Sequence, residues 1–68
     1  MKVHLVGWHR RMQKVELALL LQRHGFPLEG AHNAVEGLLD GDIVCVDTDD
    51  VDGFVDAAQR LGAVVEDE

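Results

Sequence analysis

Residues 8–14 bring together the only tryptophan of the chain and three of its six lysine and arginine residues. Tryptophan and arginine are enriched at protein-binding hot spots, and an aromatic ring flanked by guanidinium groups also stacks on nucleic-acid bases. In the alternative interpretation, Trp8 fills one end of the core and the arginines offset this chain's own carboxylates. The binding hypothesis assigns partner contacts to Trp8, His9, Arg10, Arg11 and Lys14.

Two sets of side chains are of types that ligate metal ions, namely the four histidines and the carboxylates of the acidic run at residues 47–53. The four histidines lack the paired spacing of a structural zinc site. Counted from Asp47, the acidic run has Val51 at the fifth position and Asp52 at the sixth, where a calcium loop needs an oxygen ligand and a glycine. We therefore expect no metal, and a metal carrier would have to retain bound ion through purification.

Cys45 is the single cysteine and lies in the apolar run of residues 43–46. A cysteine buried in an apolar strand behaves as a small hydrophobe, so we expect Cys45 to be no nucleophile. The sequence has no glycine-rich phosphate loop and no motif of a catalytic or cofactor site. We predict a protein without enzymatic activity and without a cofactor.

The charge of the chain is divided unevenly along its length. Residues 1–27 contain five lysine or arginine residues and one glutamate, a net charge of +4, whereas residues 28–68 contain one arginine and twelve carboxylates, a net charge of −11. The total of −7 disfavours nucleic acid as a partner unless the basic third forms a separate face. The sequence lacks both a signal-peptide pattern and an apolar run of the roughly 20 residues that span a bilayer, so we expect a cytoplasmic protein and no membrane contact.

Six segments must position these residues. Gly25 is expected to follow a helix in the left-handed conformation, with Phe26 packing back on Leu21, and Gly62 is expected to end the last helix. Thr48 or Asp49 is expected to cap the last helix. The expected elements are a strand at residues 3–6 that ends at Gly7, a helix at about 11–24, a second helix that Pro27 starts and that extends to Leu38, and a strand at 43–46. A third helix then extends from its cap to Leu61, and a strand follows at 63–65.

Hydrophobic spacing assigns a buried face to each element. The second helix is expected to bury one stripe, formed by Leu28, Ala31, Val35 and Leu38. The run 43–46 is continuously apolar, so we expect that strand to be buried on both faces or nearly so, and residues 66–68 to form a solvated tail. The sequence predicts one two-layer α+β domain over residues 1–68, in which a mainly antiparallel three-stranded sheet carries three helices on one face.

Three stretches of the sequence resemble the C-terminal domain of the bacterial ribosomal stalk protein. Residues 28–36 (LEGAHNAVE) resemble that domain's second helix, and residues 49–54 and 61–66 resemble its third helix and closing strand. The likeness extends over residues 17–66. It implies the same β-α-α-β-α-β order, which is similar to the fold of the Clp-protease adaptor that captures N-terminal degradation signals. Both families dock partner proteins, so the resemblance implies a protein-binding role.

The side chains that hold the known partners of these families are replaced in this chain. The stalk domain docks translation factors through cationic side chains on its first two helices, where the matching residues here are Ala18, Leu21, Glu29 and His32. The Clp adaptor holds a peptide amino group with an Asn-Asp-Asp run, where this chain has the sequence GWHR at residues 7–10. The resemblance therefore implies an adaptor scaffold with a different partner, and the binding hypothesis includes His32 and Ala18 at the matching positions.

The first helix has more leucines than one helix buries against a sheet. A helix on a sheet hides a stripe of roughly 100° or somewhat more. The family pattern places Leu17 and Leu20 inside, so we expect Leu19 and Leu21 to be exposed beside Ala18 as a docking or weak self-association patch. In the alternative, these are isolated exposed leucines without a role.

Two functions of different classes follow from these observations. The first is a non-enzymatic protein-interaction module or adaptor that uses residues 8–14 or the face of Leu19 and Leu21. The alternative is a ribosome- or nucleic-acid-associated protein with a basic face of Lys2, Arg10, Arg11 and Lys14. Salt distinguishes them, because phosphate binding weakens steeply with added salt whereas apolar docking barely changes.

Overall fold

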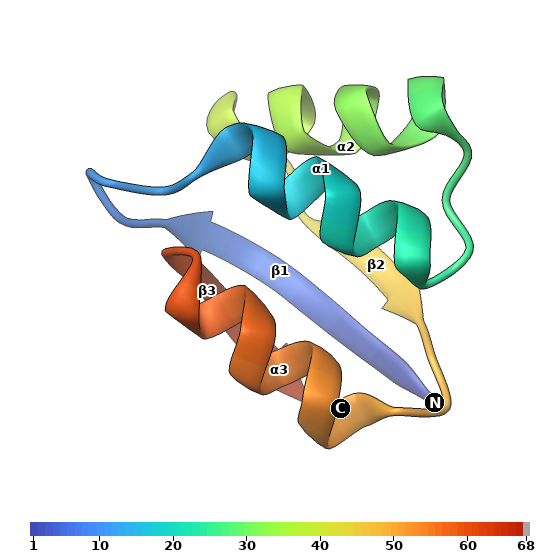
Figure 1. Cartoon of the computed structure of the whole chain (residues 1–68). Helices are drawn as coiled ribbons and strands as arrows, with labels where there is room; N and C mark the ends of the chain where they lie inside the picture. Colours follow the sequence, from blue (N-terminus) through green and yellow to red (C-terminus); the bar gives the residue numbers. More distant parts are fainter. Residues whose placement is uncertain (68) are drawn as a thin grey trace.

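Three strands form one antiparallel sheet with the order β2-β1-β3. The computed structural model describes residues 1–67 and has the element order β-α-α-β-α-β (Figure 1), which confirms the predicted order and the α+β class. The elements are β1 (Lys2–Trp8), α1 (Lys14–Arg23), α2 (Leu28–Leu39), β2 (Val44–Asp47), α3 (Val51–Arg60) and β3 (Ala63–Asp67).

The three helices lie on one face of the sheet, in front of it in Figure 1. Side chains along β2 alternate as a result, with Val44 and Val46 buried and Cys45 and Asp47 exposed. The prediction that this strand is buried on both faces is wrong, because the helices cover only one face of the sheet. Ile43 precedes the strand and is 66% exposed.

The core lies between the sheet and the helices. Its largest fully buried side chains are Phe54, Leu5, Leu17, Leu21, Leu38, Val3 and Val46. The expectation that Leu21 is exposed is wrong, whereas Leu19 is 45% exposed as predicted. Helix α1 packs between α2 and α3, and these neighbours bury a wider arc of α1 than the sheet alone would. Ala18 is buried within this arc.

Each of the three helices is followed by a glycine in the left-handed region, as predicted for Gly25, and Gly62 ends the last helix as predicted. Gly25 has a φ of 103° and Gly62 a φ of 100°. After α1, the Phe26 N–H donates to the Leu21 carbonyl oxygen at 3.0 Å, which is the hydrogen bond that closes six residues in a Schellman motif. The Phe26 side chain packs against the core. This turn sends the chain from α1 into α2.

Strand β1 is longer than its hydrophobic pattern predicts. It continues through Gly7 and Trp8, which pair with Val64 and Ala63 of β3. A register shift between Leu5 and Gly7 marks a bulge, and pairing resumes beyond it. The prediction that Gly7 ends the strand is therefore wrong, and Trp8 stands at the end of the sheet.

Helix α1 begins at Lys14, and the prediction of a start at Arg11 is wrong. The preceding residues have good helix propensity but turn back toward the end of α3, where the Met12 N–H donates to the His9 carbonyl oxygen at 3.0 Å. Met12 is 8% exposed and lies against Gly62. The burial of Met12 therefore outweighs the local preference for another helical turn.

Smaller differences occur at two element ends. Leu28 is 60% exposed because it stands at the first position of α2, while the other three predicted stripe residues are buried. Glu66 and Asp67 belong to β3 instead of a solvated tail, and Glu66 pairs with His4; Glu68 lies outside the described residues. None of the helices in residues 1–67 has the length and apolar character of a bilayer-spanning segment.

Candidate binding surfaces

Residues 8–14, named the cationic segment, form an anchored turn at one end of the molecule, on the left in Figure 1. The His9 N–H donates to the Gly62 carbonyl oxygen at 2.7 Å, and the Gln13 N–H donates to the Leu61 carbonyl oxygen at 2.9 Å. Trp8 is 44% exposed and lies outside the core cluster, so it does not fill one end of the core. The cationic side chains of the segment are also exposed, namely Arg10, Arg11 and Lys14.

The positive charge of the cationic segment is not neutralised by ion pairs within residues 1–66. No carboxylate of those residues forms a salt bridge with Arg10, Arg11 or Lys14. Arg60 is the last residue of α3, close to the anchored turn, and its Nε lies 3.1 Å from Asp56 Oδ2 on the same helix. The cationic segment therefore places unpaired positive charge at one end of a chain whose net charge is −7, whereas the charge of Arg60 is offset by Asp56.

A groove of about 220 Å³, named the α1–α3 groove, lies between these two helices. Its apolar lining consists of Leu19, Leu20, Ala57 and Leu61, and its charged lining consists of Glu16, Arg23 and Arg60. Leu61 is also the residue whose carbonyl oxygen holds Gln13, so the groove adjoins the cationic segment. Sequence reasoning identified Leu19 as a surface residue but missed the residues that α3 contributes, because helical periodicity does not specify which helices become neighbours.

A second groove, of about 190 Å³, lies between α1 and α2. It brings together Lys14 and His32, which the sequence assigned to partner contacts for separate reasons. The remaining lining residues are Val15, Val35, Glu36 and Leu39. Ala18 and Leu21 were expected on an exposed face of these helices, but both are buried in the core because α1 is enclosed by its neighbours. Surface contact through these two side chains is therefore ruled out in the folded domain.

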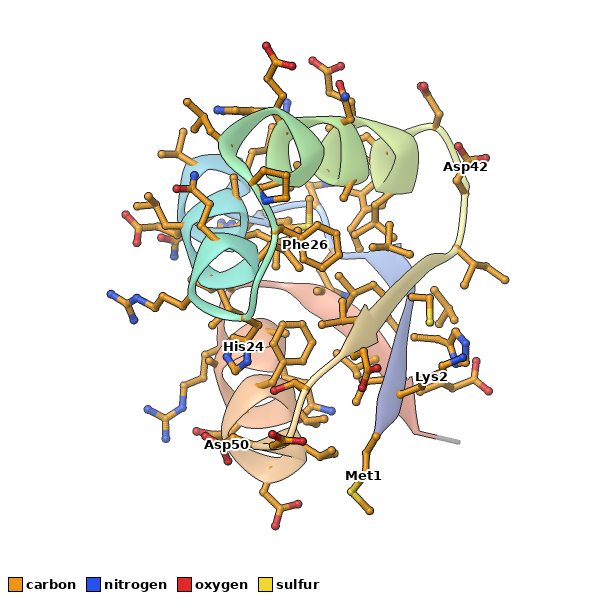
Figure 2. The ribbon with its side chains drawn as sticks, turned by 90° about the vertical axis from the view of Figure 1, so that its right-hand side faces the viewer. Met1, Lys2, His24, Phe26, Asp42 and Asp50 are labelled. Carbon is orange, nitrogen blue, oxygen red and sulfur yellow. The ribbon has the colours of Figure 1, made fainter. Side chains whose placement is uncertain are left out.

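The uncovered face of the sheet carries a row of three polar side chains from three strands. His4 of β1 pairs with Cys45 of β2 on one side and with Glu66 of β3 on the other. Lys2, which pairs with Asp47, points away from the helices in Figure 2. Cys45 is exposed, so the expectation of a buried cysteine is wrong. The described residues include no group of three or more His, Cys, Asp or Glu side chains placed to hold a metal ion.

A side-chain contact beside the acidic run of residues 47–53 joins the end of α1 to the start of α3. His24 Nδ1 lies 2.7 Å from Thr48 Oγ1, and the His24 ring meets the Phe54 ring edge-on at 4.9 Å between centroids (Figure 2). The Asp50 N–H donates to Thr48 Oγ1 at 3.2 Å. Asp50 caps α3 by accepting the backbone N–H three residues later, so the prediction of Thr48 or Asp49 as the cap is wrong. Thr48 instead ties the start of α3 to the end of α1.

Comparison of the chain with models of protein families, with curated proteins and with solved structures found no match. The resemblance to the stalk-protein domain and the Clp adaptor therefore stays a prediction. The functional interpretation rests on the surfaces described above, of which the cationic segment and the α1–α3 groove are contiguous.

Proposed function

We propose that the chain is a protein-binding domain without catalytic activity, and that the cationic segment is the centre of its contact surface. The observation that supports this proposal is the exposure of Trp8 beside Arg10 and Arg11 on a backbone held by hydrogen bonds to the turn after α3. Tryptophan and arginine side chains contribute most to binding when a partner desolvates them, and an anchored backbone loses little conformational entropy on binding.

The cationic segment favours a partner with an acidic surface. Positive charge that forms no ion pair within residues 1–66 attracts such a partner over long range and orients it during the encounter. We place the domain in the cytoplasm, where an exposed single thiol such as that of Cys45 stays reduced. The partner is a protein other than the known partners of the stalk domain and the Clp adaptor, because the side chains that hold those partners are replaced.

A second candidate function is binding to nucleic acid or to the ribosome. The observation in its favour is the same segment, since Trp8 can stack on a base while Arg10, Arg11 and Lys14 contact phosphates. The net charge of −7 opposes it, because the rest of the surface repels a phosphate backbone. Protein binding is favoured because an acidic protein surface has a lower charge density than a nucleic acid, so the carboxylates of this domain repel it less.

The test is quantitative affinity capture from a nuclease-treated native cell extract, followed by binding measurements with the purified captured protein. The variants are Trp8→Ala and, as a matched control at a distant exposed apolar side chain, Leu28→Ala. We expect Trp8→Ala to weaken binding by about tenfold or more, as for a hot-spot residue, and Leu28→Ala to leave it unchanged. Unchanged binding of a correctly folded Trp8→Ala protein would refute the proposal, and capture that disappears with nuclease would favour nucleic acid.

A further inference from the structure

The α1–α3 groove has the capacity of one large side chain. Its volume of about 220 Å³ lies below the 300–1,000 Å³ typical of sites for small molecules. Leu19 lies in this groove with 45% of its surface exposed, whereas the neighbouring Leu20 is 7% exposed and packs on the core. An apolar side chain from a partner would therefore complete the burial of Leu19.

The charges around the groove select the chemistry of its occupant. Arg23 lies in the last turn of α1 and forms no salt bridge with residues 1–66. Arg60 uses its Nε for Asp56, which leaves the terminal nitrogens of its guanidinium group for another acceptor. The lining contains one carboxylate, from Glu16, and Asp56 offsets Arg60, so the groove alone has no net charge. The adjoining cationic segment adds Arg10, Arg11 and Lys14, so the joint surface is positive, with five cations against two carboxylates. Charge complementarity therefore favours an acidic segment.

The groove continues into the cationic segment. The Gln13 N–H donates to the Leu61 carbonyl oxygen, and the Leu17 N–H in α1 donates to the Gln13 carbonyl oxygen, both at 2.9 Å. Gln13 therefore links the lining of the groove to the residues that carry Arg10 and Arg11. A chain segment seated in the groove would extend past Arg60 toward these two guanidinium groups.

We infer that the α1–α3 groove binds an acidic peptide segment of a partner protein, with one large apolar side chain of that segment against Leu19 and its carboxylates at Arg23 and Arg60. This inference rests on the proposed function and adds the chemistry of the partner. A nucleic acid fits less well, because the apolar lining of the groove forms no hydrogen bond or ion pair with a phosphate, and Glu16 repels a phosphate. A second copy of this chain is the competing occupant, because Ile43 is 66% exposed next to Asp42, and the sedimentation measurement below distinguishes it from a partner peptide.

The first arm of the test uses a short fluorescein-labelled peptide with one leucine flanked by aspartate and glutamate. Amide chemical shifts of the isotope-labelled protein are followed during its titration, and anisotropy gives the affinity. We expect saturable shifts at Leu19, Leu20, Ala57 and Leu61. Replacing the leucine of the peptide by serine, or its acids by amides, should each weaken binding by about fivefold or more.

The second arm uses protein variants at exposed sites. Leu19→Asp places a carboxylate in the groove and Arg23→Gln removes a cation, so each should weaken peptide binding by about fivefold or more. Leu28→Asp is the matched control on α2 and should have no effect. Circular dichroism verifies that each variant is folded.

Three results would overturn the inference. These are the absence of shifts in the groove, equal binding by the serine peptide, and tighter binding of a single-stranded oligonucleotide of equal charge. Self-association in sedimentation that Leu19→Asp abolishes would also overturn it, in favour of a second copy. If Trp8→Ala abolishes partner capture and Leu19→Asp does not, the proposed function stands and the inference about the groove fails.

Discussion

Replacing Gly62 by alanine tests the contact that holds the cationic segment in place. Gly62 has a φ of +100°, and a Cβ atom there would lie 2.8 Å from the Met12 Cα and 3.2 Å from the Met12 nitrogen. Gly25 is the matched control, because its φ is +103° and its Cβ would meet nothing within 4 Å. Both alanines adopt an unfavourable backbone conformation, but only the one at position 62 also overlaps a backbone atom that cannot rotate away.

The expected magnitudes follow from these two contributions. A left-handed conformation costs a residue with a Cβ about 1–2 kcal/mol, so Gly25→Ala should lower the free energy of unfolding by that amount. Overpacking adds about 1–3 kcal/mol at Gly62, so Gly62→Ala should lower it by about 2–5 kcal/mol. A domain of 68 residues has a total stability of about 3–10 kcal/mol, so the Gly62 variant loses a large share of it.

Urea unfolding followed by far-ultraviolet circular dichroism measures both free energies. The fluorescence of Trp8 provides a second readout, because this single tryptophan adjoins the turn that the Gly62 substitution displaces. Its native-state emission should change in Gly62→Ala and stay unchanged in Gly25→Ala. Equal destabilisation of the two variants, within about 0.5 kcal/mol, would refute the close approach of Met12 to Gly62.

Three further outcomes are expected. Leu21→Ala should lower the free energy of unfolding by about 2–5 kcal/mol and Leu19→Ala by less than about 1 kcal/mol, because only Leu21 is fully buried. If urea unfolding ranks the two variants in the opposite order, the packing of α1 is contradicted. Thr48→Val should lower the free energy of unfolding by about 1–2 kcal/mol, because the Thr48 hydroxyl is hydrogen-bonded to His24 and to a backbone N–H. Thr48→Ser keeps the hydroxyl and should recover most of this loss in thermal unfolding. Equal stability of Thr48→Val and the wild type would refute this role of the hydroxyl. Cys45 should react completely with a maleimide in native buffer, and a reaction that requires denaturant would contradict its exposure.

The local signals in the sequence predicted the order of the elements. Gly25 followed by Phe26 specifies a Schellman motif because the backbone conformation and the hydrophobic contact both arise within a few residues. The stripe of α2 is equally local, and three of its four predicted residues are buried. Such features depend on neighbours in sequence, so the sequence alone identifies them.

Features set by neighbouring elements were not predictable in the same way. The burial of Leu21 depends on α1 lying between α2 and α3, and the exposure of Cys45 depends on the helices covering one face of the sheet. The start of α1 at Lys14 depends on hydrogen bonds to the turn after α3, which is distant in sequence. The α1–α3 groove has the same origin, since four of its seven lining residues come from α1 and the other three from the end of α3 and Leu61, which α2 and β2 separate from α1 in the sequence.

The direction of β1 explains how an acidic chain can present a cationic binding end. This strand begins beside the acidic run of residues 47–53, where the Thr48 N–H donates to the Met1 carbonyl oxygen at 2.9 Å. It ends at Trp8, where the cationic segment starts. The acidic run of residues 47–53 therefore lies beside the start of β1, and the cationic segment follows the end of the same strand (Figure 1). An approaching acidic partner is repelled by one end and attracted by the other, so the field of the domain turns Trp8 and the α1–α3 groove toward it before contact.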